Sequence, residues 1–170
     1  MIVLFCERKS KTEKEITEIL KNMGGNYISD KSIFDNSGNF TIITEYKVTD
    51  ICADKGIAIF CENTKKFASQ ILPVGFIGIC EDKNKNALDI FKKNNTPVIT
   101  CGMNPKNTIT LSSITKSNAL VCIQRTLENE KGSLTEPFEI NIDLSKNYNP
   151  FSITTSVAVL LLNGIIPKTL

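Results

Sequence analysis

The sequence predicts an α/β fold: a Rossmann-like parallel sheet with flanking helices, an antiparallel hairpin extension and a closing C-terminal helix. Three observations lead to this fold class. Up to residue 105, short apolar runs alternate with amphipathic stretches of about ten residues, as in right-handed β–α–β units. After residue 106, two extended runs are separated only by a short turn, which indicates a hairpin. The apolar stretch 153–166 follows an Asn-Pro pair, which is typical of a helix start.

Length and composition favour one folding unit. The chain has 170 residues, of which 41% are hydrophobic and 22% charged, as in an ordinary globular protein. A chain of this size buries roughly 68–70% of the surface that its unfolded form exposes, so it can form a stable core without disulfide or metal cross-links. We therefore expect a single domain over residues 1–170, with the parallel part at 1–105 and the hairpin strands and last helix at 106–170.

The N-terminal elements follow from apolar patterning. Residues 2–6 form a continuous apolar run, as in a buried parallel strand. Thr12 and Glu15 read as a capping box, which predicts a helix that begins there and ends at Gly24-Gly25. Residues 27–29 and 40–44 read as strands on either side of a polar, turn-like stretch at 30–39.

The remaining elements follow the same reasoning. Strands are expected over 56–61, 75–80 and 97–101, with helices between them over 64–72 and 84–94. Beyond them, the sequence predicts extended runs at 107–115 and 118–124, a turn at 130–132, and an alternating, half-buried strand at 137–144. The last helix is expected over 150–163, capped by Asn149 and lying on the sheet.

Charge and residue usage exclude several functions. The chain has no histidine, which removes the commonest general base and every His-ligated metal site. The 20 basic and 18 acidic residues alternate along the chain, so we expect no nucleic-acid partner. No apolar stretch is long enough to span a bilayer and no signal peptide is evident, so we expect no membrane partner.

The six cysteines predict a reducing compartment. None of them forms a C-x-x-C motif, and most stand inside apolar runs, as small buried hydrophobic residues do. We therefore expect all six to be free thiols in a cytoplasmic protein.

Four predicted strands end in a similar way, with a cysteine and often a glutamate. Carboxyl ends of parallel strands share one edge, where ligands of open α/β sheets bind. The residues concerned are the thiols of Cys6, Cys61, Cys80 and Cys101 and the carboxylates of Glu7, Glu62 and Glu81. They indicate either a reactive thiol or soft metal site, or cysteines that fill tight positions beside solvated glutamates; we expect no metal.

The loop after the strand at 97–101 is a second candidate. Gly102 would let the backbone approach a ligand, and Asn104, Lys106 and Asn107 would supply polar contacts. The alternative is a plain turn into the hairpin. Because neither G-x-x-x-x-G-K-[ST] nor a G-x-G-x-x-G after the first strand occurs, we expect no nucleotide cofactor.

The C-terminal part resembles the central domain of Mur ligases. The strand and loop at 98–102, the extended run at 107–110, and the stretch from Asn149 to Ile165 carry the resemblance, with the hairpin strands in matching order between them. The resemblance implies a ligand crevice near Gly102 and the helix at Asn149. The family's phosphate-binding loop, its Mg-binding glutamate and histidine, and its C-terminal domain have no match, so ATP-dependent ligation is not expected.

Three functions follow from these observations. The missing histidine and glycine loops favour a non-catalytic, Mur-ligase-like module that binds a small molecule or a protein, over an enzyme. One alternative is a structural protein that self-associates as a homo-oligomer through its C-terminal helix. The other is an enzyme that uses a Cys or Glu at the carboxyl edge of the sheet.

Overall fold

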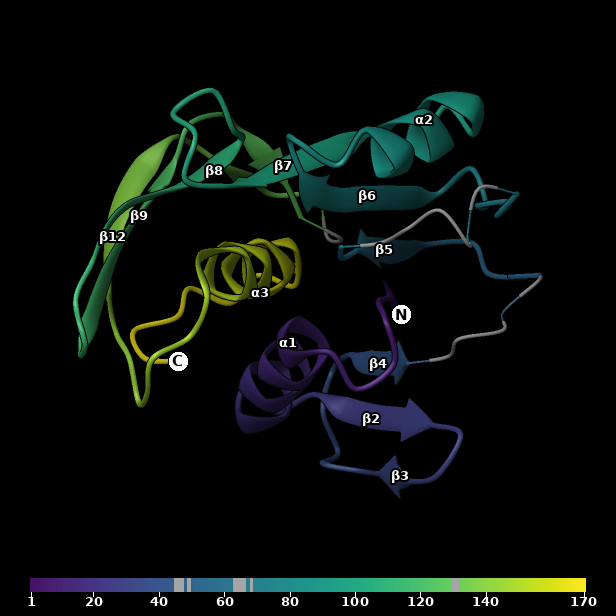
Figure 1. Ribbon diagram of the computed structural model, residues 1–170, viewed down its shortest axis with the longest axis horizontal. Coiled ribbons are helices and arrows are strands. Elements are labelled where there is room, and N and C mark those ends of the chain that lie inside the picture. The colour runs from purple at the N-terminus through teal and green to yellow at the C-terminus, as the bar shows by residue number, and fades with distance from the viewer. Residues whose placement is uncertain (45–47, 49, 63–66, 68, 130–131) are drawn as a thin grey trace.

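The protein has a mixed α/β fold built on one long, curved sheet (Figure 1). The structure is a computed structural model that describes residues 1–44, 48, 50–62, 67, 69–129 and 132–170. Ten strands of these residues form the sheet, in the order β12-β9-β8-β7-β6-β5-β1-β4-β2-β3. The helix expected over 64–72 and the turn expected at 130–132 fall in part outside the described residues.

The centre of the sheet is parallel, as the strand–helix alternation predicts. Its four central strands are β1 (Ile2–Phe5), β5 (Gly56–Phe60), β6 (Phe76–Glu81) and β7 (Val98–Gly102). β1 pairs with β5, β5 with β6, and β6 with β7, each time in parallel. All four carboxyl ends therefore lie at one edge of the sheet.

The N-terminal strands extend the sheet beyond β1. β4 (Thr41–Thr44) pairs in parallel with β1, and β2 (Asn26–Ser29) pairs in parallel with β4. β3 (Ile33–Phe34) pairs antiparallel with β2 and lies at the outer edge. The stretch 30–39, expected to be turn-like throughout, thus contributes a short strand.

The C-terminal strands continue the same sheet on the other side. β8 (Ile109–Ile114) pairs in parallel with the last two residues of β7, so it starts where β7 ends. β9 (Asn118–Ile123) and β12 (Phe138–Asp143) follow antiparallel, as the sequence predicts. β10 (Leu127–Glu128) and β11 (Leu134–Thr135) form a separate small pair.

Of the three helices among the described residues, two start and end within one residue of the prediction. α2 (Lys85–Lys93) is capped by Asn84 and α3 (Pro150–Leu162) by Asn149. The expected capping box of α1 (Lys11–Asn22) is wrong, because the cap is Ser10, whose Oγ accepts from the Glu13 amide. Ser10 and Glu13 have the same spacing as the predicted pair Thr12 and Glu15, two residues earlier in the chain. The Glu15 side chain can therefore contact another element of the fold.

Two apolar cores lie on opposite faces of the sheet. α1 and α3 lie side by side on one face, and β9 and β12 curve around α3 (Figure 1). α2 covers the other face, where Phe5, Phe60 and Phe91 pack ring against ring. Every residue of α3 from 151 to 162 is buried, which confirms that this helix packs on the sheet.

Candidate functional site

A cavity of about 760 Å³ opens at the carboxyl edge of the parallel strands. We call it the edge cavity. One wall is formed by residues 62, 81–83 and 102–104, which follow or end β5, β6 and β7. The other wall is formed by residues 10–12 at the start of α1 and 149–151 at the start of α3. The edge cavity thus lies where open α/β sheets bind their ligands.

A buried glutamate holds the two helix starts together. The Glu15 carboxylate accepts hydrogen bonds from the Asn149 backbone N–H (3.0 Å) and from its side-chain Nδ2 (2.5 Å). Asn149 in turn caps α3, because its Oδ1 accepts from the Ser152 amide at 2.8 Å. Since the backbone N–H groups at helix starts carry partial positive charge, this wall favours electron-rich ligand atoms.

The opposite wall is acidic. Glu62, Glu81 and Asp82 line it, and the Asn104 side-chain Nδ2 donates to Asp82 Oδ2 at 2.6 Å. Burial raises the pKa of Glu81, and the neighbouring carboxylates of Glu62 and Asp82 raise it further, against a smaller opposing effect of Lys83. The raised pKa of Glu81 is of the kind that acid–base groups in clefts often show.

The loop between β7 and β8 closes one end of the edge cavity. Gly102 has φ +143°, a conformation that other residues rarely adopt, and a Cβ there would lie 3.1 Å from Asn107 Nδ2. The position therefore requires glycine. The Asn107 side chain is buried behind the loop, without a hydrogen-bond partner among the described residues, and does not line the cavity.

The strand-end cysteines do not gather at one reactive site. Cys6 and Cys61 follow two neighbouring parallel strands in register, and a disulfide joins them, with Cα atoms 4.8 Å apart. The expectation of six free thiols is therefore wrong for this pair. Cys101 lies in the same core as the disulfide, whereas Cys80 lies in the core on the other face.

The two buried free thiols at this edge are poor nucleophiles. Burial raises the pKa of Cys80 to about 12, and the nearby carboxylates of Asp82 and Glu81 add to this effect. Burial also raises the pKa of Cys101. Because the thiolate is the reactive form, neither side chain has the lowered pKa of a catalytic cysteine. Among the described residues, no group of three or more Cys, Asp or Glu could hold a metal ion.

The strand-end argument and the loop argument each found two lining residues of the edge cavity. Glu62, Glu81, Gly102 and Asn104 line it, whereas the predicted candidates Glu7, Lys106 and Asn107 do not. The start of α1 at 10–12 was not predicted, whereas a crevice near the start of α3, which contributes 149–151, was expected only from the Mur-ligase resemblance. The helix caps at both places were the available signal, since α/β crevices lie between strand ends and helix starts.

The connection from β1 to α1 occupies the place of a phosphate-binding loop. In G-x-x-x-x-G-K-[ST], the last two residues open the helix, and Lys11 and Thr12 do so here. The two glycines of the pattern are replaced by Phe5 and Ser10. The Lys9 amide donates to the Glu13 carboxylate at 2.6 Å, so a carboxylate of the chain already occupies this amide.

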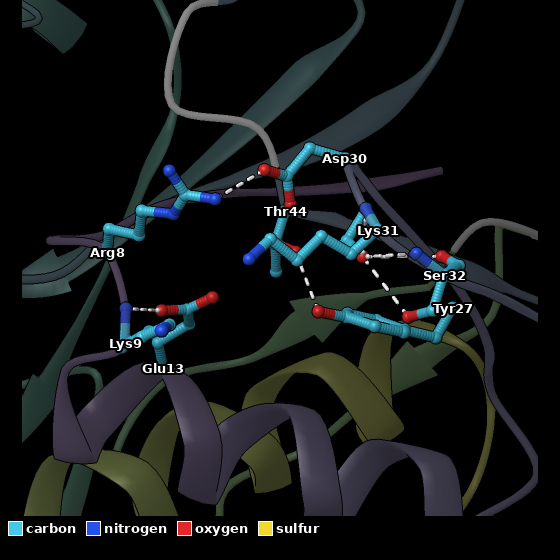
Figure 2. Close-up of polar contacts among 9 residues, drawn as sticks. Arg8, Lys9, Glu13, Tyr27, Asp30, Lys31, Ser32 and Thr44 are labelled. Carbon is cyan, nitrogen blue, oxygen red and sulfur yellow. Dashed lines mark hydrogen bonds and ion pairs between the residues drawn. The ribbon is translucent and has the colours of Figure 1, made fainter.

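A second hollow borders the same connection, and several of its lining residues are drawn in Figure 2. It has a volume of about 260 Å³, and we call it the α1 hollow. Its lining residues come from the β1–α1 connection, α1, β2 and the turn after β2; they are Arg8, Lys9, Glu13, Lys14, Tyr27, Ser29, Asp30, Lys31 and Ser32. Figure 2 shows Arg8 paired with Asp30 (2.5 Å) and the Tyr27 hydroxyl hydrogen-bonded to Thr44 (2.9 Å).

Comparisons with known proteins leave the family open. The chain matches no protein-family model, and no curated protein has recognisable sequence similarity to it. Within the described part of the chain, none of the helices is both long and apolar enough to cross a membrane.

Proposed function

We propose that this protein is a non-catalytic binding module that holds a small polar molecule in the edge cavity. The observation that carries the proposal is the position of this 760 Å³ cavity, between the carboxyl ends of neighbouring parallel strands and the starts of two helices. Small-molecule sites of α/β proteins are concave and lie at this edge. If this proposal holds, the sheet is Rossmann-like in that its ligand binds at the carboxyl ends of the parallel strands.

The charges of the lining residues favour a particular ligand class. Three carboxylates, Glu62, Glu81 and Asp82, stand against two ammonium groups, Lys11 and Lys83. Lys11 is already engaged, with its Nζ 3.5 Å from Glu15 Oε1. A ligand that offers hydroxyl or amino groups to the carboxylates is therefore favoured over a phosphorylated one.

We further propose that residues 98–165 are Mur-ligase-like. The element order supports this: β7 ends in Gly102, a short loop leads to the β8–β9 hairpin, and α3 starts at Asn149. The replaced glycines at Phe5 and Ser10 support a module without the family's nucleotide chemistry. We expect no micromolar ATP affinity.

One observation favours an enzyme as a second candidate. Glu81 has a raised pKa and lines a cavity, which suits a group that transfers protons. The thiol-based alternative has less support, because Cys80 and Cys101 are buried with raised pKa values. The hypothesis of self-association through α3 has less support, since residues 151–162 of this helix are buried within the chain and offer no exposed apolar face.

Native mass spectrometry of the purified protein tests the binding proposal, because it reports any retained ligand directly. A fragment library rich in polyols and amines would then be titrated while the amide NMR signals of Gly102 and Asn104 are followed. We expect Glu81→Gln to weaken binding about tenfold. Glu7→Gln is the matched control, since Glu7 also follows a strand end but does not line the cavity.

Two outcomes would overturn the proposal. One is that no fragment shifts the signals of Gly102 and Asn104 at millimolar concentration and no ligand is retained. The other is that Glu7→Gln weakens binding as much as Glu81→Gln. Turnover of a bound compound that Glu81→Gln abolishes would favour the enzyme instead.

A further inference from the structure

The α1 hollow is distinct from the edge cavity in its charge. Four cationic side chains line it, Arg8, Lys9, Lys14 and Lys31, against the two carboxylates of Glu13 and Asp30. The excess of two positive charges equals the formal net charge of the whole chain, +2. The cationic residues come from two segments, 8–14 and the turn after β2, and the fold brings these segments together.

Both carboxylates of the hollow already have partners. Asp30 Oδ2 pairs with Arg8 Nη2, and Glu13 Oε2 accepts from the Lys9 amide. Within the described residues, the side chains of Lys9, Lys14 and Lys31 form no ion pair. With Arg8 paired to Asp30, three ammonium groups stand against the single carboxylate of Glu13, so an excess of two positive charges remains among the described lining residues.

Hydroxyl groups add polar contacts to the same hollow. Ser29 and Ser32 line it, with their Oγ atoms 3.2 Å apart. The Ser29 hydroxyl is already used, because it accepts from the Lys31 and Ser32 amides, whereas the Ser32 hydroxyl keeps further hydrogen-bonding capacity. The volume of about 260 Å³ corresponds to roughly nine waters at their volume in liquid water. A phosphoryl group, or two linked ones, fits this space, whereas a large ligand would extend beyond it.

We propose that the α1 hollow binds the phosphoryl group of a small anionic ligand through Lys9, Lys14 and Lys31. Phosphoryl oxygens accept several charge-assisted hydrogen bonds at once, which three ammonium groups on one hollow can donate. The site is separate from the edge cavity, and the proposal does not depend on what that cavity binds.

An NMR titration with inorganic pyrophosphate at low ionic strength tests the proposal. The amides of Lys9 and Lys31 should shift, and the affinity should fall as salt is added. An ammonium about 4 Å from an anionic charge in water contributes roughly fivefold in affinity. Lys14→Gln/Lys31→Gln should therefore weaken pyrophosphate binding about 25-fold.

A matched double variant separates a site from general charge attraction. Lys85→Gln/Lys92→Gln removes the same charge from exposed positions on α2, and we expect less than a twofold effect. Glu81→Gln should leave pyrophosphate binding unchanged, which keeps this test distinct from that of the edge cavity.

Three results would overturn the proposal. Pyrophosphate could fail to bind at millimolar concentration. The α2 variant could lose as much affinity as the α1-hollow variant. A single-stranded oligonucleotide could bind more tightly than pyrophosphate and also shift Lys146, which lies outside the hollow and would mark an extended polyanion surface.

Discussion

The link between Glu15 and Asn149 allows a quantitative test of how the edge cavity is held open. Glu15→Gln replaces a buried carboxylate by a neutral amide of nearly the same shape. The Glu15 carboxylate accepts two hydrogen bonds from Asn149 and lies on an almost fully buried side chain, 8% exposed. The variant can keep one acceptor oxygen but loses the charge on it.

The expected cost follows from the strength of charge-assisted hydrogen bonds. A hydrogen bond to a charged group contributes about 1.5–3 kcal/mol, and one between neutral groups about 1 kcal/mol. Two weakened bonds therefore cost about 2 kcal/mol in the free energy of unfolding. In a domain of this size, each kcal/mol lowers the Tm by roughly 2–4 °C, so we expect a decrease of about 4–8 °C.

Glu18→Gln on the same helix is the matched control. Glu18 pairs with Lys146, and both side chains are nearly half exposed, at 45% and 48%. Exposed ion pairs contribute less than about 1 kcal/mol. Urea unfolding at pH 7, followed by circular dichroism, compares the two variants. Equal midpoints for the two would refute the idea that Glu15 joins the two helix starts.

Three further predictions concern the core, pH and the thiols. Leu160→Asp should unfold the protein, because Leu160 is fully buried and an unpaired buried carboxylate costs several kcal/mol. The control Asn163→Asp, at the end of the helix, should cost about 1 kcal/mol. A Leu160→Asp variant that is folded by circular dichroism would contradict this prediction. The pKa of Glu81 is raised in the folded protein above its ordinary value of 4.5, so the protonated side chain favours the folded state. This contribution to the free energy of unfolding is fully present below pH 4.5 and is lost as the pH rises through the folded pKa. Glu81→Gln should therefore gain more Tm over the wild type at pH 7 than at pH 4, and an equal difference at both would count against the raised pKa. Without reductant, the denatured protein should titrate four thiols, and six after reduction; six before reduction would contradict the Cys6–Cys61 disulfide.

Local sequence signals predicted most of the elements. Apolar runs and Asn caps placed the parallel strands, α2 and α3 within one or two residues, because capping and periodicity depend on neighbours in the chain. β3 was missed because it has only two residues, both exposed, and exists through its pairing with β2. A polar stretch gives no local signal for such pairing.

The site was predicted in part for a related reason. Glu62 and Glu81 were found because parallel strands bring their carboxyl ends to one edge. The start of α3 was expected only from the family resemblance, and its link to α1 was not predicted, because Asn149 and Glu15 are 134 residues apart in the sequence. The Cys6–Cys61 pair was missed although both residues end predicted parallel strands, since apolar surroundings were taken as a sign of free thiols.

The buried position of α3 also bears on how the chain folds during synthesis. α3 leaves the ribosome after every strand that it covers, and its side chains fill the core on the α1 side of the sheet. Until then, β6, β7 and β8 present an uncovered apolar face, which is a surface that chaperones bind and that promotes aggregation. Contacts between α3 and α1 join segments more than a hundred residues apart, so the decisive packing step waits for long-range closure and should be slow. A nascent chain that stops before residue 150 would be held in this uncovered state.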